Sequence, residues 1–245
     1  MIERLLAFAD ADAGLYGAVA LSEGDSASAV IASGEQVLSL ADATAARGEG
    51  VLRVSAGECE PGLILGLAAH TGQLAFDTGE ERGLRVQAIG ASGEIANAPE
   101  GIPDGFEAYG VSWQISGEAD QAALRTTWAV LEDRSLLLLF ALRPTAVDHH
   151  GTETLGAVRV GADGAVSSFA EPLLSTEYDG AGRQVRATLE LWGDGEEGPA
   201  TRGAGSRCAG GSAALADGEL EAARFDWKLD GVPGIGGYEI FRAVA

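Results

Sequence analysis

Residues 124–142 read Leu-Arg-Thr-Thr-Trp-Ala-Val-Leu-Glu-Asp-Arg-Ser-Leu-Leu-Leu-Leu-Phe-Ala-Leu, and this stretch decides the fold class. It holds two apolar, strand-length runs separated by the polar tripeptide at 132–134. Short apolar runs joined by such a turn are typical of a β-hairpin. The pattern recurs around the turn sequences at 161–164 and 179–182. The second half of the chain therefore predicts consecutive antiparallel strands.

Similar strand-length segments, bounded by Gly, Asp, Ser or Pro, fill the chain from residue 15 onward. Residues 186–192 and 220–228 alternate apolar and polar side chains, as half-buried strands do. The 36 glycines are about twice the usual share of roughly 7%, and glycine supplies the positive φ that tight hairpins need. We find no helical periodicity between the strands, which argues against a parallel sheet. The sequence predicts an all-β protein of barrel or sandwich type.

The N-terminus is the exception, because Ile2, Leu5, Leu6 and Ala9 fall at helical spacing. We therefore predict a short N-terminal helix that ends before residue 15. A second break is expected at 98–105, which contains two prolines and two glycines. This segment divides the chain into two predicted domains, 1–105 and 106–245.

The charge balance excludes several partners. The chain has 16 basic and 37 acidic residues, for a net charge of −21. Nucleic acids and anionic membrane surfaces both require a basic protein surface. An acidic surface could instead recognise a basic partner, or serve only solubility.

The cysteines and the apolar runs predict the cellular compartment of the protein. Cys59 and Cys208 are too few for a disulfide framework, which predicts a reducing, cytoplasmic environment. No apolar run approaches the ~20 residues of a membrane span. The start of the chain is also too short in apolar residues for a secretory signal. We expect no membrane span, and the sequence leaves the oligomeric state open.

His149 and His150, with Glu153 nearby, could form a metal site or an acid–base pair. A third ligand at a typical spacing is missing, so we predict no metal and no cofactor. His149 remains a candidate catalytic residue and His150 a candidate ligand contact in a loop that could gate a cavity. The alternative is a solvated loop.

Charged residues inside apolar strands are the more informative candidates. Glu190 and Glu239 are each flanked by bulky apolar residues, and Arg202 lies in the following predicted strand. These side chains could point into a barrel, where a charge must be paired or functional. Glu190 or Glu239 would then be a catalytic acid oriented by Arg202. The alternative places them on the solvent face as cross-strand ion pairs.

Large aromatic side chains are candidates for lining a ligand cavity. We include Trp128, Trp192 and Tyr238 in the ligand-binding set, although such residues are also common in plain cores. The glycine-rich segment 230–237 lacks the Lys-Ser/Thr of a phosphate-binding loop and precedes a strand. We therefore interpret this segment as a hairpin turn.

Five segments of the second half together resemble a known family: the hairpin at 132–134, Glu153 to Gly156, Tyr178 to Trp192, Arg202 to Gly205, and the closing stretch 230–242. They resemble the lipocalin-like, two-barrel family that includes hydroxyneurosporene synthase (carotenoid 1,2-hydratase). The resemblance implies two consecutive lipocalin or calycin-like antiparallel barrels. It also implies hydrophobic ligands of isoprenoid, steroid or lipid-like type, with acid-assisted chemistry on double bonds in some members. The Arg-Asp-x-Ser-Trp-Gly-like segment of many relatives is absent here.

The leading hypothesis is a protein that binds a hydrophobic small molecule in a barrel cavity, with acid-assisted hydration, isomerisation or cyclisation as the chemistry it could perform. A non-enzymatic acidic scaffold or partner-binding protein is the alternative from another class. A metal enzyme built on His149, His150 and Glu153 is the third.

Overall fold

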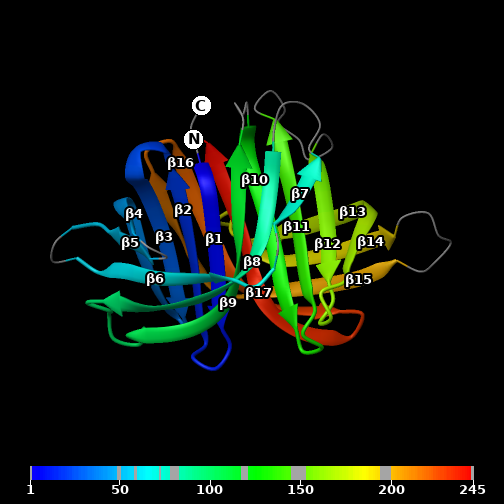
Figure 1. The fold of residues 1–245 in the computed structure, drawn as a ribbon, viewed down its shortest axis with the longest axis horizontal. Coiled ribbons are helices and arrows are strands. Elements are labelled where there is room, and N and C mark those ends of the chain that lie inside the picture. Colours follow the sequence, from blue (N-terminus) through cyan, green and yellow to red (C-terminus); the bar gives the residue numbers. More distant parts are fainter. Residues whose placement is uncertain are drawn as a thin grey trace.

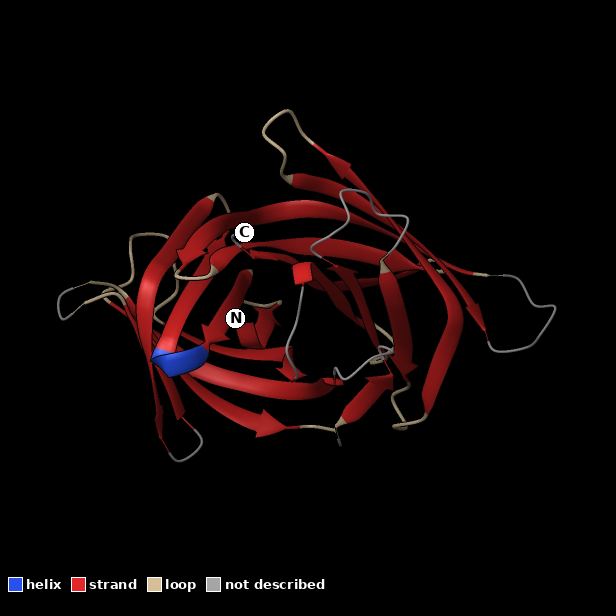
Figure 2. Cartoon of the chain, turned by 90° about the horizontal axis from the view of Figure 1, so that it is seen from above, coloured by secondary structure: helices blue, strands red, loops and turns tan. Residues whose placement is uncertain are grey.

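Two antiparallel β-barrels lie side by side, and both chain ends lie at the same edge of the molecule (Figure 1). The computed structural model describes residues 2–48, 51–57, 60–71, 73–77, 83–116, 121–144, 153–193 and 200–243. Almost all of the described chain is strand, and its single helical turn is η1, Glu23–Asp25 (Figure 2).

The first barrel is built from the first nine strands. Its sheet order is β6-β5-β4-β3-β2-β1-β9-β8, and β6 also pairs with β8, which closes an eight-stranded ring. The short strand β7 extends the sheet beside β8. The strands are β1 Ile2–Asp10, β2 Leu15–Ser22, β3 Ser26–Ser33, β4 Gln36–Gly48, β5 Val51–Ser55, β6 Gly62–Ala69, β7 Leu74–Asp77, β8 Gly83–Ala96 and β9 Gly105–Ser116.

The second barrel closes in simple chain order, from β10 to β17, with β10 paired to β17. Its strands are β10 Gln121–Leu131, β11 Leu136–Pro144, β12 Thr154–Val160, β13 Val166–Tyr178, β14 Gln184–Gly193, β15 Thr201–Leu215, β16 Gly218–Leu229 and β17 Val232–Ala243. The predicted all-β, two-barrel class is confirmed. The predicted boundary at residue 105 stays a prediction, and β9, which follows it, pairs with β1 and β8 of the first sheet.

The predicted hairpins occur where the turn residues indicated. Arg134 has a φ of 65° in the β10–β11 turn, and Gly164 has a φ of 82° in the β12–β13 turn. In the glycine-rich segment, only Asp230 and Gly231 form the turn, with φ of 46° and 89°. The remaining glycines of that segment lie inside β17.

The buried apolar side chains of the described residues form three clusters. One cluster fills the first barrel and includes Leu6 and Phe8. Another fills the second barrel and includes Phe225 and Ile240. The third lies between the barrels and contains residues of both, such as Trp113 of the first. Because the strands at the junction are covered on both faces, their sequences lose the alternation of a half-exposed strand.

The predicted N-terminal helix is wrong, because residues 2–10 form strand β1. This strand pairs with β2 on one side and β9 on the other. From Leu5 onward, its odd-numbered side chains face the junction, and the even-numbered Leu6 and Phe8 face the barrel interior. With both faces buried, adjacent apolar residues imitate helical spacing. Among the described residues, no helix is long and apolar enough to cross a membrane.

Candidate functional site

A groove of about 640 Å3 lies between the two barrels. The first barrel contributes the end of β1, the turn that follows it, and β9, while the second contributes β10, β16 and β17. This volume is in the range of roughly 300–1,000 Å3 that is common for small-molecule sites. A neighbouring groove of about 680 Å3 lies on the first barrel and shares part of the same rim.

The side of the groove formed by the second barrel is apolar and aromatic. Its lining includes Trp128, Val130, Leu131, Trp227 and Ile235. Trp128 is fully buried and Trp227 nearly so, which fixes both rings within the protein. Little of either ring is therefore exposed to the groove, and the partly buried Val130 and Ile235 supply its apolar surface.

Two buried donors belong to residues of the groove lining and find no acceptor among the described residues. Trp227 Nε1 and Arg224 Nε are both buried and without a hydrogen-bond partner. The other nitrogens of Arg224 donate to the carbonyl oxygen of Gly14 at 3.2 Å and to Asp226 at 3.3 Å. Leaving a buried donor unpaired costs about 1–3 kcal/mol, so such donors usually have partners.

The rim of the groove is acidic. Five carboxylates and one arginine take part in the lining: Asp10, Asp12, Glu107, Glu132, Asp226 and Arg224. Asp10 is held in place because it accepts the backbone N–H groups of Asp12 at 3.0 Å and Glu107 at 3.2 Å. A negative ligand would be repelled by this rim. The groove therefore suits an apolar molecule without negative charge.

Glu239 lies directly behind Trp128, fully buried between the barrels. One carboxyl oxygen accepts the Trp128 indole N–H at 3.0 Å and the Tyr16 hydroxyl at 2.7 Å. The other accepts the Thr126 hydroxyl at 2.7 Å. Tyr16 belongs to β2 of the first barrel, and the other three residues belong to β10 and β17 of the second. The carboxyl group thus connects the two barrels.

Burial raises the pKa of Glu239 from 4.5 to about 7, although its three hydrogen bonds act in the opposite direction. Burial also raises the pKa of Tyr16 well above 10, and the charge of Glu239 adds to this effect. Near neutral pH, Tyr16 therefore remains a hydroxyl donor, while Glu239 is close to the midpoint of its titration.

Two glycines of β17 provide the space for this cluster. A Cβ at Gly237 would overlap the carboxyl oxygen of Glu239 and would lie 2.8 Å from the Tyr16 ring. A Cβ at Gly236 would overlap the carbonyl oxygen of Trp128. The glycine pair in the sequence therefore marks close strand packing around Glu239.

Glu239 itself does not line the groove, because Trp128 stands between them. An indole N–H is a donor only and cannot pass a proton onward. In this geometry Glu239 is a positioning residue that holds the Trp128 ring. Direct proton transfer from Glu239 to a molecule in the groove would require Trp128 to move.

Tyr238, another predicted ligand contact, points the opposite way from Glu239. It packs in the second barrel, where its hydroxyl lies 2.7 Å from Thr176 Oγ1 and accepts a hydrogen bond from Arg125 at 3.1 Å. Sequence reasoning considered that Glu239 could point into a barrel. Instead, Tyr238 and Ile240 point into the barrel and Glu239 points to the junction.

The other predicted site residues lie elsewhere. Glu190 and Arg202 are cross-strand neighbours and form an ion pair of 3.2 Å, with 43% and 72% of their side chains exposed. This is the solvent-face alternative, and it separates them from Glu239. Trp192 is exposed on β14. His149 and His150 lie outside the described residues, so their roles stay predictions.

Sequence reasoning did not identify Tyr16, Thr126 or Arg224. A usable signal was the polar run Arg125-Thr126-Thr127 inside an apolar strand, since polar residues buried in a strand need partners. Glu153, considered as a metal ligand, is buried in an ion pair with Arg125. Among the described residues, no group of His, Cys, Asp and Glu side chains is arranged to hold a metal.

No family model and no curated protein matches this sequence. Solved structures do match over 98% of the chain. Kievitone hydratase from Nectria haematococca matches over 88% of its length, with a TM-score of 0.66 and 11% identity. The protein assigned as AttH from Nitrosomonas europaea matches over 91% of its length, with a TM-score of 0.62 and 14% identity. CghA, solved with Sch210972, matches over 88%, with a TM-score of 0.60 and 11% identity.

These likenesses show the fold: the chain has the two-barrel, lipocalin-like architecture of these proteins. The predicted resemblance is therefore confirmed at the level of the fold.

Proposed function

We propose that this protein binds a hydrophobic small molecule without negative charge in the groove between its barrels. The observation that carries this proposal is the groove itself, with its apolar wall on the second barrel. The acidic rim disfavours anionic ligands. Among the described residues, the two barrel interiors hold apolar clusters, which favours the junction over a barrel interior as the position of the proposed ligand.

The solved structures with the same fold support a small organic ligand. One is named as a hydratase of kievitone, and another was solved with the compound Sch210972. At 11% identity these names describe those proteins. For this chain, the resemblance of its second half to the carotenoid 1,2-hydratase family makes isoprenoid, steroid or other lipid-like compounds the first classes to test.

The test is a fluorescence titration with Nile red, an uncharged apolar dye that carries oxygen acceptors. We expect saturable binding to the wild type and a loss of about tenfold or more in Ile235→Glu, because a carboxylate would enter the apolar wall. The matched control is Leu173→Glu, since Leu173 is 56% exposed on β13 and outside the groove. Equal binding to the wild type and Ile235→Glu would refute the proposed site.

Acid-assisted hydration, isomerisation or cyclisation is the second candidate. It is favoured by the carboxyl of Glu239, whose pKa of about 7 leaves it partly protonated near neutrality and which would reach a ligand only if Trp128 moved aside. Incubation with farnesol, an uncharged isoprenoid alcohol with double bonds, in H2(18O) would reveal hydration as incorporation of heavy oxygen into the product. Binding of farnesol with no labelled or rearranged product would favour a carrier over an enzyme.

A further inference from the structure

A second polar site lies at the other end of the second barrel. The groove between the barrels is reached at the end of β10 that contains Val130 and Leu131. The opposite end of β10, at Ala123 and Arg125, borders a separate cavity of about 180 Å3. This cavity is therefore independent of the proposed ligand groove.

Arginines dominate this end of the barrel. Arg125, Arg143 and Arg242 line the cavity together with one carboxylate, Glu153. The other described residues of the lining are Ala123, Tyr178 and Ile240. The described part of the lining carries three positive charges against one negative charge, in a chain whose net charge is −21.

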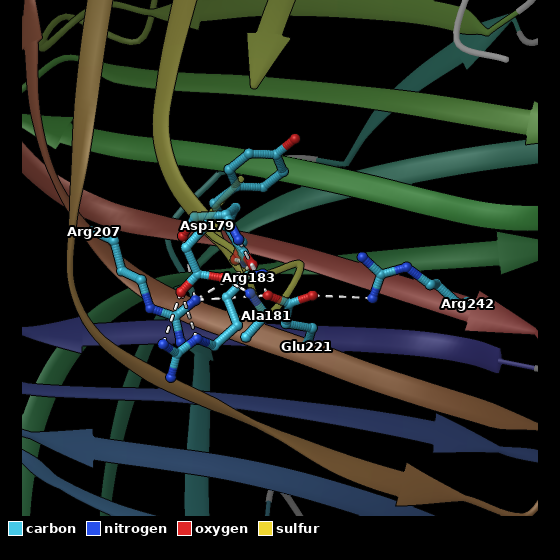
Figure 3. Close-up of polar contacts among 8 residues, drawn as sticks. Asp179, Ala181, Arg183, Arg207, Glu221 and Arg242 are labelled. Carbon is cyan, nitrogen blue, oxygen red and sulfur yellow. Dashed lines mark hydrogen bonds and ion pairs between the residues drawn. The ribbon is translucent and has the colours of Figure 1, made fainter. Parts of the chain in front are cut away.

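Two carboxylates are already engaged by this arginine cluster. Glu153 forms a buried ion pair with Arg125, in which the two side chains are only 2% and 5% exposed. Glu221 lies between two arginines, at 3.0 Å from Arg242 and 3.6 Å from Arg207 (Figure 3). Four arginines therefore face two glutamates here: Arg125, Arg143, Arg207 and Arg242 against Glu153 and Glu221.

These two carboxylates form their ion pairs with arginines other than Arg143. Among the residues that the structure describes, Arg143 has no ion-pair partner, and its Nε is buried without an acceptor. The Nε of Arg125 is buried and unpaired in the same way. Buried guanidinium N–H groups normally find acceptors. Because Arg143 also lines the cavity, an anion held there would supply the counter-charge that its guanidinium lacks among the described residues.

The residues that line the cavity indicate which kind of acceptor it would bind. Guanidinium groups bind carboxylate and phosphate oxygens through paired N–H donors. The hydroxyl of Tyr238, next to Arg125, stays protonated because burial raises its pKa to about 12. It therefore adds no negative charge to compete with an incoming anion. A cavity of about 180 Å3 has room for one oxyanion group with a short attachment.

We propose that this end of the second barrel binds a small oxyanion, the carboxylate or phosphate group of a small molecule, between Arg143 and Arg242. The anion would pair with the Arg143 guanidinium and balance the excess positive charge of the described lining residues. The groove between the barrels, with its acidic rim, would not accept the same ligand.

Isothermal titration calorimetry with inorganic phosphate, butyrate and the uncharged analogue butyramide tests the proposal at constant ionic strength. We expect at least one of the two anions to bind the wild type at a single site, and butyramide to bind at least about tenfold more weakly. Tighter binding of phosphate would identify a phosphate ligand, and tighter binding of butyrate a carboxylate.

The key variant is Arg143→Gln, which should weaken anion binding by about tenfold or more. Arg143→Lys keeps the charge without the paired donors and should bind between the two. Arg202→Gln is the matched control, because Arg202 is an exposed arginine on the outer face of the same barrel. Circular dichroism would verify that each variant is folded. The proposal fails if neither anion binds the wild type, if butyramide binds equally well, or if Arg143→Gln binds like the wild type.

Discussion

The buried carboxyl of Glu239 should make the folded protein lose stability as the pH rises through neutrality. Its pKa is about 7 in the folded protein, against an ordinary value of 4.5. Between these two values the folded protein holds a proton that the unfolded chain has released. The free energy of unfolding therefore decreases as the pH increases over this interval.

The size of the effect follows from the pKa difference. A carboxyl whose pKa is raised from 4.5 to about 7 contributes a change of about 3 kcal/mol. This contribution is fully present below about pH 4.5 and is lost by about pH 8. Since small proteins have total stabilities of about 5–15 kcal/mol, the loss should be easy to measure.

The assay is urea unfolding of the wild type and Glu239→Gln at intervals from about pH 5 to about pH 8. The glutamine amide keeps the side-chain size and can still accept hydrogen bonds from Tyr16 and Trp128. Taking the difference between the two proteins cancels the titration of all other groups. The free energy of unfolding of Glu239→Gln minus that of the wild type should increase by about 3 kcal/mol as the pH rises.

The matched control is Glu190→Gln, because Glu190 forms an exposed ion pair on the outer face. Its difference from the wild type should stay nearly constant across the same pH range, since exposed ion pairs contribute little. A flat difference profile for Glu239→Gln as well would refute the argument that burial governs this carboxyl.

Three further substitutions test the packing around the site. Gly237→Ala should destabilise the protein by about 1–3 kcal/mol in urea unfolding, because its Cβ would overlap a buried carboxyl oxygen; Gly193→Ala, whose Cβ meets nothing, is the control. Trp128→Phe should lower the free energy of unfolding by about 1–3 kcal/mol, because it removes the indole donor to Glu239. A decrease smaller than the experimental error would show that this hydrogen bond contributes little to stability. Arg125→Gln should cost about 3–5 kcal/mol by leaving its buried carboxylate partner unpaired, whereas the exposed Arg202→Gln should change stability by under about 1 kcal/mol.

The hairpin turns of the fold could be predicted from the sequence, because a turn depends on the residues within it. The tripeptide at 132–134, Asp163-Gly164 and Asp230-Gly231 all lie in hairpin turns of the structure. Residues 2–10 were misassigned because their pattern depends on what covers each face of the strand. That covering comes from β2, β9 and the second barrel, which are distant in sequence.

The candidate site was visible only in part for the same reason. Glu190 and Glu239 have similar apolar neighbours in the sequence, yet one is exposed and the other fully buried. Strand alternation says which residues share a face, but not whether that face meets solvent, a barrel interior or a second barrel. The partner that distinguishes Glu239 is Tyr16, which lies 223 positions away.

By itself, then, the sequence determined the all-β class, the hairpin positions and the excess of negative charge. These properties follow from turn residues, strand periodicity and composition, which act locally or as simple totals. Only the tertiary structure decided that a groove opens between the barrels, that Glu239 lies behind Trp128, and that arginines collect at one barrel end. Each of these depends on the closure and docking of two sheets, which brings together side chains that no local pattern relates.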